Sequence, residues 1–75
     1  MNSFSAVIDA FGGRFAEAIG IPKNHVRTMK ARDSIPSSRW LDTVVAAREF
    51  GIEGVTLDLL ARLDAEKSRQ REAAQ

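Results

Sequence analysis

Apolar residues recur along most of this chain every three or four positions, which is the spacing of one face of an α-helix. In the first segment the residues at this spacing are Phe4, Val7, Ile8 and Phe11. Ser3 or Ser5 can cap the helix that they predict, which should end near residue 11. No segment alternates apolar and polar residues as a half-buried strand does. The pattern therefore predicts an all-α fold, a compact bundle of five helices.

Glycines divide the next part of the chain into two short helices. The pair at positions 12 and 13 ends the first helix, and a second is expected over about residues 13–19. Gly20 then supplies the positive φ that a helix-ending turn favours, because glycine has no Cβ to clash. Pro22 suits the first turn of a third helix, where its missing N–H leaves no intrahelical bond unmade. This third helix is expected over about residues 23–32.

Two longer helices are predicted in the second half of the chain. Pro36 stands at the first position of a fourth helix that ends at Gly51. Its buried stripe is expected to consist of Trp40, Leu41, Val44 and Val45, with Ala47 at one edge. Thr56 is a good N-cap for a fifth helix. The apolar residues of that helix are Leu57, Leu59, Leu60 and Leu63, which cover more than one narrow face.

Residues 1–75 are expected to form a single domain, because so short a chain leaves room for one hydrophobic core. The core should span about residues 3–63. Residues 64–75 are polar and rich in alanine, which predicts a solvated helical or frayed tail. The chain has no cysteine, no apolar run long enough to span a bilayer and no signal-peptide pattern. A cytoplasmic protein without membrane contact is therefore expected.

The net charge of +1 conceals an uneven distribution of basic residues. Residues 1–32 carry five basic and two acidic side chains, whereas residues 33–75 carry six basic and eight acidic ones. Between Ala18 and Arg32 there is no acidic residue. A local excess of positive charge favours contact with phosphates, so it points to a nucleic-acid partner near the third helix.

Residues 12–31 fit the twenty-position pattern of a helix-turn-helix. Ala16 is small where the two helices should cross, and Gly20 stands at the turn. The apolar positions hold Phe15, Ile19, Ile21, Val26 and Met29. On these residues, and on the linker-like segment 32–36, residues 3–63 resemble the Cro and phage-repressor family of DNA-binding domains. Two residues depart from the family's pattern, which often has an aromatic residue in place of Met29 and a Ser or Thr cap in place of Pro22.

The resemblance implies a lambda-repressor-like domain whose third helix enters the major groove while the second braces it across the backbone. The residues expected against base edges lie on one face of the third helix: Lys23, Asn24, Arg27 and Thr28. Arg27 and Lys23 can donate hydrogen bonds to guanine, and Asn24 can pair both ways with adenine. Thr28 can contact a thymine methyl or a phosphate. The alternative is a solvated face whose charges serve solubility.

A second group of residues is expected to contact the DNA backbone: Gly13, Arg14, Lys30, Arg32, Ser38 and Arg39. Gly13 and Arg14 begin the second helix, where free N–H groups and the helix dipole favour an anion. Ser38 and Arg39 stand in the first turn of the fourth helix, where free N–H groups can again meet a DNA strand. For each residue taken alone, an ordinary exposed side chain is an equal alternative.

No arrangement of residues indicates catalysis or a metal site. His25 is the only histidine, and it can either flank the phosphates or cover the edge of the core. Ser37 and Ser38 lack a base with an orienting acid, and there is no glycine-rich phosphate loop. Trp40 fits a core position better than an interface position. We therefore expect no enzymatic activity, metal, cofactor or small-molecule ligand.

The sequence thus predicts a sequence-specific regulator of transcription, of bacterial or phage type, that binds double-stranded DNA. The resemblance implies a repressor that occupies promoter DNA as a homodimer on an inverted repeat. Leu57 and Leu59 are the candidates for the dimer interface, whereas Leu60 and Leu63 should close the domain. Two alternatives stay open: an antitoxin or adaptor that mainly binds another protein, and an activator that offers its acidic half to RNA polymerase.

Overall fold

Five α-helices and one 3₁₀ turn make up the fold, and the computed structural model describes residues 1–73. The helices are α1 (Phe4–Asp9), α2 (Phe15–Ile19), α3 (Lys23–Arg32), α4 (Trp40–Glu49) and α5 (Leu57–Ala73), and the turn η1 covers Ser37–Arg39. Residues 1–73 contain no strand. The prediction of an all-α fold with five helices is therefore confirmed.

Local signals in the sequence set most of the helix boundaries. The Ser3 hydroxyl accepts a hydrogen bond from the N–H of Ala6 (3.0 Å) and so caps α1. The Thr56 hydroxyl accepts one from the N–H of Leu59 (3.0 Å) and so caps α5. Gly20 adopts the expected left-handed conformation (φ 71°) at the end of α2. The third helix begins and ends at the predicted residues.

The second helix is shorter than predicted. Gly12 and Gly13 both adopt positive φ, 60° and 85°, so the chain does not follow a helical path before Arg14. As a result α2 begins at Phe15 rather than near residue 13. The two glycines form the connection between α1 and α2 and do not belong to the first turn of α2.

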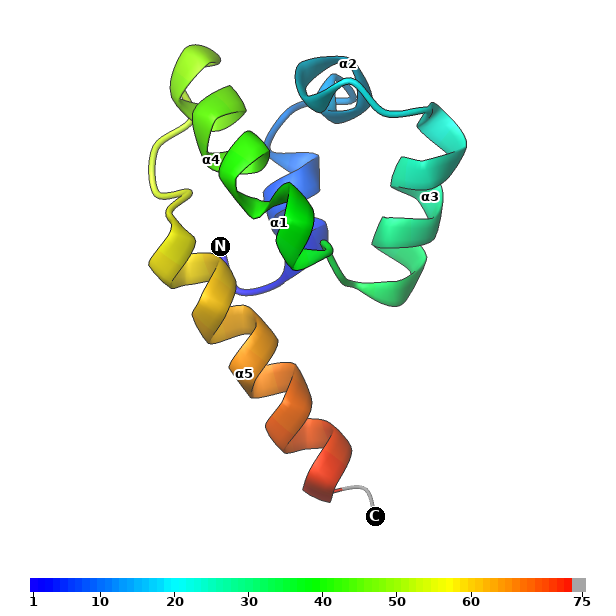
Figure 1. The fold of residues 1–75 in the computed structure, drawn as a ribbon, viewed down its shortest axis with the longest axis vertical. Helices are drawn as coiled ribbons and strands as arrows, with labels where there is room; N and C mark the ends of the chain where they lie inside the picture. Colours follow the sequence, from blue (N-terminus) through cyan, green and yellow to red (C-terminus); the bar gives the residue numbers. More distant parts are fainter. Residues whose placement is uncertain (74–75) are drawn as a thin grey trace.

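The core lies around α1, which Figure 1 shows near the centre of the molecule behind α4. Its largest fully buried side chains are Phe4, Phe15, Ile35, Leu60 and Val7. The ring of Phe11 lies edge-on to that of Phe15, with 5.1 Å between their centroids, and 5.7 Å from that of Phe50. Contacts between α1 and α3, α2 and α3, α2 and α4, and α4 and α5 complete the packing.

The buried face of α4 differs from the predicted stripe. Leu41 and Val45 are 62% and 46% exposed. The residues that α4 buries are Thr43, Ala46 and Ala47, with Trp40 and Val44 half-buried. Pro36 also does not begin the helix, since the chain first makes the 3₁₀ turn η1. The prediction that Leu41 and Val45 belong to the core is therefore wrong.

Small side chains and one satisfied hydroxyl explain this rotation of α4. Ala46 and Ala47 are buried, and side chains this small let a helix pack closely against the core. The Thr43 hydroxyl donates to the carbonyl oxygen of Arg39 (2.8 Å), so its burial leaves no polar group unpaired. The indole N–H of Trp40 donates to the carbonyl oxygen of Ile35 (2.7 Å), which holds that ring at the edge of the core. Leu41 and Val45 then lie on the outer side.

The fifth helix extends well beyond the rest of the molecule (Figure 1). Leu60 and Leu63 are buried, which confirms the prediction that they close the domain. The helix continues to Ala73 through the predicted polar tail, of which residues 74 and 75 lie outside the described residues. In the part of the chain that the structure describes, no helix combines the length and the apolar character needed to cross a membrane.

Candidate nucleic-acid interface

A tight corner joins α2 to α3. The left-handed Gly20 donates its N–H to the carbonyl oxygen of Ala16, and the N–H of Ile21 donates to the same oxygen (2.9 Å). Ala16, Ile21 and Met29 are buried, and Val26 is half-buried against the core. The apolar side of the corner is thus fixed on the core, and this orients the opposite side of α3 toward solvent.

The outward face of α3 is polar and free of acidic residues. All four residues predicted to meet base edges are exposed: Lys23, Asn24, Arg27 and Thr28. With Val26 and Met29 turned inward, the 100° step per residue centres Asn24, Arg27, Thr28 and Ala31 on the outer side. Lys23 lies nearer to one flank of this face. The sequence therefore located the outward face, and the structure places Asn24, Arg27 and Thr28 together on it, with Lys23 at its edge.

Local hydrogen bonds already hold part of this face in place. The amide oxygen of Asn24 accepts from the N–H of His25 (3.1 Å), which leaves the amide NH₂ to donate elsewhere. The Thr28 hydroxyl donates to the carbonyl oxygen of Asn24 (3.2 Å). Within the described part of the chain, neither Arg27 nor Lys23 forms an ion pair. Two cations are thus presented to solvent without an internal counter-ion.

One side of α3, here called the α1 flank, combines Lys23 and Lys30 with Gly13. These three residues line one hollow together with Asp9 of α1. The ammonium of Lys30 lies 2.6 Å from a carboxylate oxygen of Asp9, and both side chains are about half exposed. An exposed pair of this kind contributes little to stability, so Lys30 can exchange the carboxylate for another anion at small cost.

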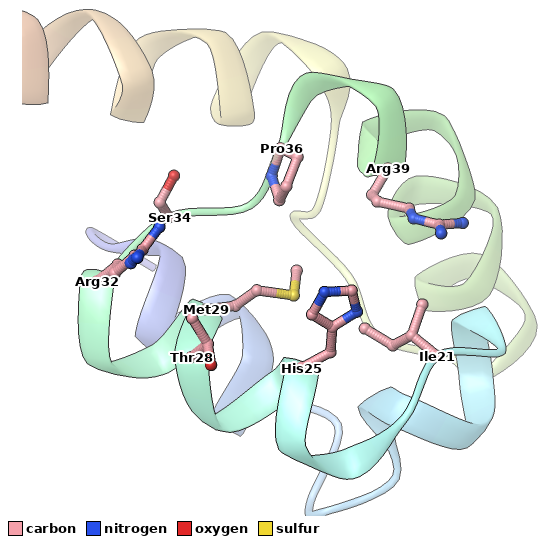
Figure 2. Close-up of a pocket in the computed structure, with 8 residues that line it drawn as sticks. All are labelled: Ile21, His25, Thr28, Met29, Arg32, Ser34, Pro36 and Arg39. Atoms are coloured by element: carbon pink, nitrogen blue, oxygen red, sulfur yellow. The ribbon is translucent and has the colours of Figure 1, made fainter.

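The other side of α3, here called the η1 flank, combines Arg32 and His25 with Arg39. They line a hollow of about 190 Å³ whose apolar part comes from Ile21, Met29 and Pro36. Figure 2 shows the ring of His25 between the side chains of Met29 and Ile21, and the guanidinium of Arg39 directed away from Met29. That guanidinium lies 3.7 Å from a carboxylate oxygen of Asp42. Ser38 is exposed beside it in η1.

Arg14 is the one predicted backbone contact that lies apart from both flanks. Its guanidinium carbon is 4.6 Å from the centroid of the Phe50 ring, at the end of α4. The same side chain lies 3.9 Å from a carboxylate oxygen of Glu17. A cation over an aromatic face is held there by the ring quadrupole. Arg14 therefore contacts the end of α4, while its side chain stays 62% exposed.

The two leucines proposed for a dimer interface differ in their surroundings. Leu57 is 48% exposed at the first turn of α5. Leu59 is half-buried and packs against the core. Only Leu57 is therefore largely available to a second molecule, while most of Leu59 serves this domain.

The C-terminal end of α3 includes contacts that the sequence pattern did not indicate. The ammonium of Lys67, from α5, donates to the carbonyl oxygens of Arg32 and Asp33 (2.6 and 2.7 Å). The carboxylate of Asp33 accepts from the N–H of Ser5 (2.8 Å) at the start of α1. These residues are 28 to 35 positions apart, so no local spacing could have revealed them.

Neither a family model, nor a curated protein, nor a solved structure matches this chain. Among residues 1–70, no three His, Asp or Glu side chains gather as a metal site would require. The functional interpretation therefore depends on the geometry of α3 and its two flanks.

Proposed function

We propose that this protein is a sequence-specific DNA-binding regulator of transcription that reads double-stranded DNA with α3. The observation that carries the proposal is the polar, acid-free outward face of α3 on a corner whose other side is buried. A major groove admits one α-helix, and such a helix reaches base edges with the side chains of its outer face. In this interpretation α2, Gly20 and α3 form the helix-turn-helix of a Cro-like domain.

Three residues of the outward face have a chemical partner among the bases. Arg27 can donate two parallel hydrogen bonds to O6 and N7 of guanine. The NH₂ of Asn24, left unused by the contact to His25, can donate to N7 of adenine while its oxygen accepts from N6. The methyl group of Thr28 can pack on a thymine methyl, because its hydroxyl is directed to the backbone of α3.

The two flanks of α3 supply cations to the two DNA strands. A helix in the major groove lies between two phosphate backbones, so positive charge is needed on both of its sides. Lys23 and Lys30 provide it on the α1 flank, and Arg32 and Arg39 on the η1 flank. Asp9 and Asp42 keep two of these cations in place until phosphates replace them.

The proposed DNA binding is tested by fluorescence anisotropy with a selected duplex and a random duplex across a salt series. We expect tight binding to the selected site and a steep salt dependence. If a complex makes about six phosphate contacts, its affinity falls about a thousandfold between roughly 50 and 200 mM salt. A protein that binds no duplex, or that binds selected and random duplexes equally at every salt concentration, contradicts the proposal.

We further propose that the regulator acts as a homodimer, with Leu57 at the N-terminal end of α5 in the dimer interface. It would repress transcription by occupying promoter DNA. We expect the free protein to sediment as a dimer and the Leu57→Asp variant to sediment as a monomer. Leu57 is 48% exposed at the first turn of α5, where an acidic residue suits the helix dipole, so the variant should keep its fold. Circular dichroism provides that control. A parent protein that is monomeric both free and on DNA contradicts the homodimer.

A second candidate function is supported by the outer side of α4. Leu41 and Val45 lie one helical turn apart, are 62% and 46% exposed, and share a shallow hollow with Ala18 and Ile19 of α2. Asp42 and Glu49 border the same hollow, so it combines exposed apolar side chains with acidic ones, as the rim of a protein-binding surface does. It favours an adaptor or antitoxin in which DNA binding is secondary. Binding of a protein partner together with weak, sequence-independent DNA binding would support this alternative over the first.

A further inference from the structure

Three helices meet at the C-terminal end of α3. This meeting point, here called the Asp33 junction, consists of Ser5 from α1, Asp33 after α3 and Lys67 from α5. Asp33 ends α3 in a left-handed conformation (φ 50°), which is uncommon for a residue other than glycine. The conformation closes the helix, because the N–H groups of Asp33 and Ser34 turn back to the carbonyl oxygens of Lys30 and Met29 (3.1 and 3.0 Å).

The Asp33 side chain compensates for this backbone conformation. Its carboxylate accepts the N–H of Ser5 at 2.8 Å, in the first turn of α1, where a free N–H and the helix dipole favour a negative charge. The Ser5 hydroxyl also donates to the carbonyl oxygen of Lys30 (3.1 Å). Two hydrogen bonds therefore attach the last turn of α3 to the first turn of α1.

Lys67 satisfies two carbonyl oxygens that the helix-ending turn leaves without a partner. Its ammonium lies 2.6 Å from the carbonyl oxygen of Arg32 and 2.7 Å from that of Asp33. A cation at this end also meets the negative pole of the dipole of α3. The Lys67 side chain is half-buried, whereas its neighbours Glu66 and Ser68 are exposed. Leu63, one turn earlier, is buried in the core and fixes this part of α5.

We propose that Lys67 is a positioning residue for DNA reading. By attaching the end of α3 to α5, it fixes the direction in which α3 presents Arg27 and Asn24 to the bases. The same helix α5 carries Leu57, so Lys67 also connects the proposed dimer contact to the reading helix. This inference rests on the proposed DNA-binding function.

The test compares Lys67→Met with Arg69→Met in the full chain. Met has nearly the helix propensity of Lys and Arg, so neither variant weakens α5 locally. Both variants remove one positive charge from the same part of α5, but Arg69 is exposed and makes none of the hydrogen bonds at the Asp33 junction. We expect Lys67→Met to bind the selected duplex about fivefold more weakly than Arg69→Met, because two charge-assisted hydrogen bonds are lost. Lys67→Arg, which keeps a cationic donor, should restore most of the affinity.

The salt series separates positioning from direct contact with DNA. A lysine that touches a phosphate lowers the salt slope by about one unit when it is removed. A positioning residue instead leaves the slope and the random-duplex affinity unchanged and lowers only the affinity for the selected site. Amide hydrogen exchange of the free protein should also be faster in the last turn of α3 in Lys67→Met than in Arg69→Met.

The outcomes distinguish this inference from the function on which it depends. If the parent protein reads a selected site and Lys67→Met reads it as well as Arg69→Met does, the inference is wrong and the proposed function stands. A reduced salt slope in Lys67→Met also overturns it, since Lys67 would then contact the phosphates. If the parent protein binds no duplex, the proposed function fails, and this inference fails with it.

Discussion

Replacing Leu60 with alanine should destabilise this protein more than any other change that we predict. The Leu60 side chain, in the first half of α5, is fully buried in the core. Truncating a buried leucine typically costs about 2–5 kcal/mol. Part of this cost is the lost free energy of burying the removed methyl groups away from water, and the rest comes from the cavity that remains. At about 0.05–0.15 kcal/mol per residue, a chain of this length has a total stability of roughly 4–11 kcal/mol. The substitution therefore removes a large share of the free energy of unfolding.

Thermal unfolding followed by circular dichroism measures this effect. We expect the midpoint to fall by about 10 °C or more, since about 1 kcal/mol corresponds to roughly 4–8 °C in a domain of this size. Leu41→Ala is the matched control, because it makes the same chemical change at a side chain that is 62% exposed. Its effect should stay within about 0.5 kcal/mol. If the two variants lose the same amount of thermal stability, Leu41 is as buried as Leu60. The orientation of α4 described above would then be wrong.

This pair of leucines also shows what the sequence could and could not predict about the fold. The bounds of α3 followed from signals within a few residues of each end, such as Gly20 and the change of pattern after Arg32. The orientation of α4 depended on which neighbours approach it, and no local pattern contains that information. Trp40, Leu41, Val44 and Val45 formed a stripe at helical spacing, yet the side of α4 that the core buries is the one with Thr43, Ala46 and Ala47.

The candidate interface was predictable to a similar extent. The outward face of α3 followed from the inward position of Val26 and Met29, because a helix that buries one side must expose the other. The pairing of Arg39 with Asp42 lies within one helical turn and could have been anticipated. Contacts such as Lys30 with Asp9 join separate helices and required the tertiary structure. The solvent-facing positions of α3 can thus be predicted from the residues of the helix itself. The acidic partners of its cations come from other helices and cannot.

Replacing Arg27 with alanine is the change expected to have the largest effect on DNA binding. Arg27 is exposed on the outward face of α3, and within the described residues its guanidinium forms no ion pair. The guanidinium can therefore bind a guanine without first breaking an ion pair within the protein. Its hydrogen bonds to the base then contribute to the binding free energy without that cost. Loss of its two parallel hydrogen bonds should cost about 1–3 kcal/mol and relax the preference at one base position.

Selection of binding sites from a random duplex pool, with parent protein and variant side by side, measures both effects. The parent should select guanine at one position of the site, whereas the Arg27→Ala variant should accept any base there. The preferences at the other positions should not change. Arg48→Ala is the matched control: Arg48 is exposed near the end of α4, it lines a hollow with residues 51–56 rather than either flank of α3, and its removal lowers the net charge equally. This control should keep the full preference and lose little affinity, because a distant cation contributes only a screened, sequence-independent term. If Arg27→Ala and Arg48→Ala select the same sites with the same affinity, the assignment of Arg27 to a base is wrong, and the polar face of α3 serves solubility alone.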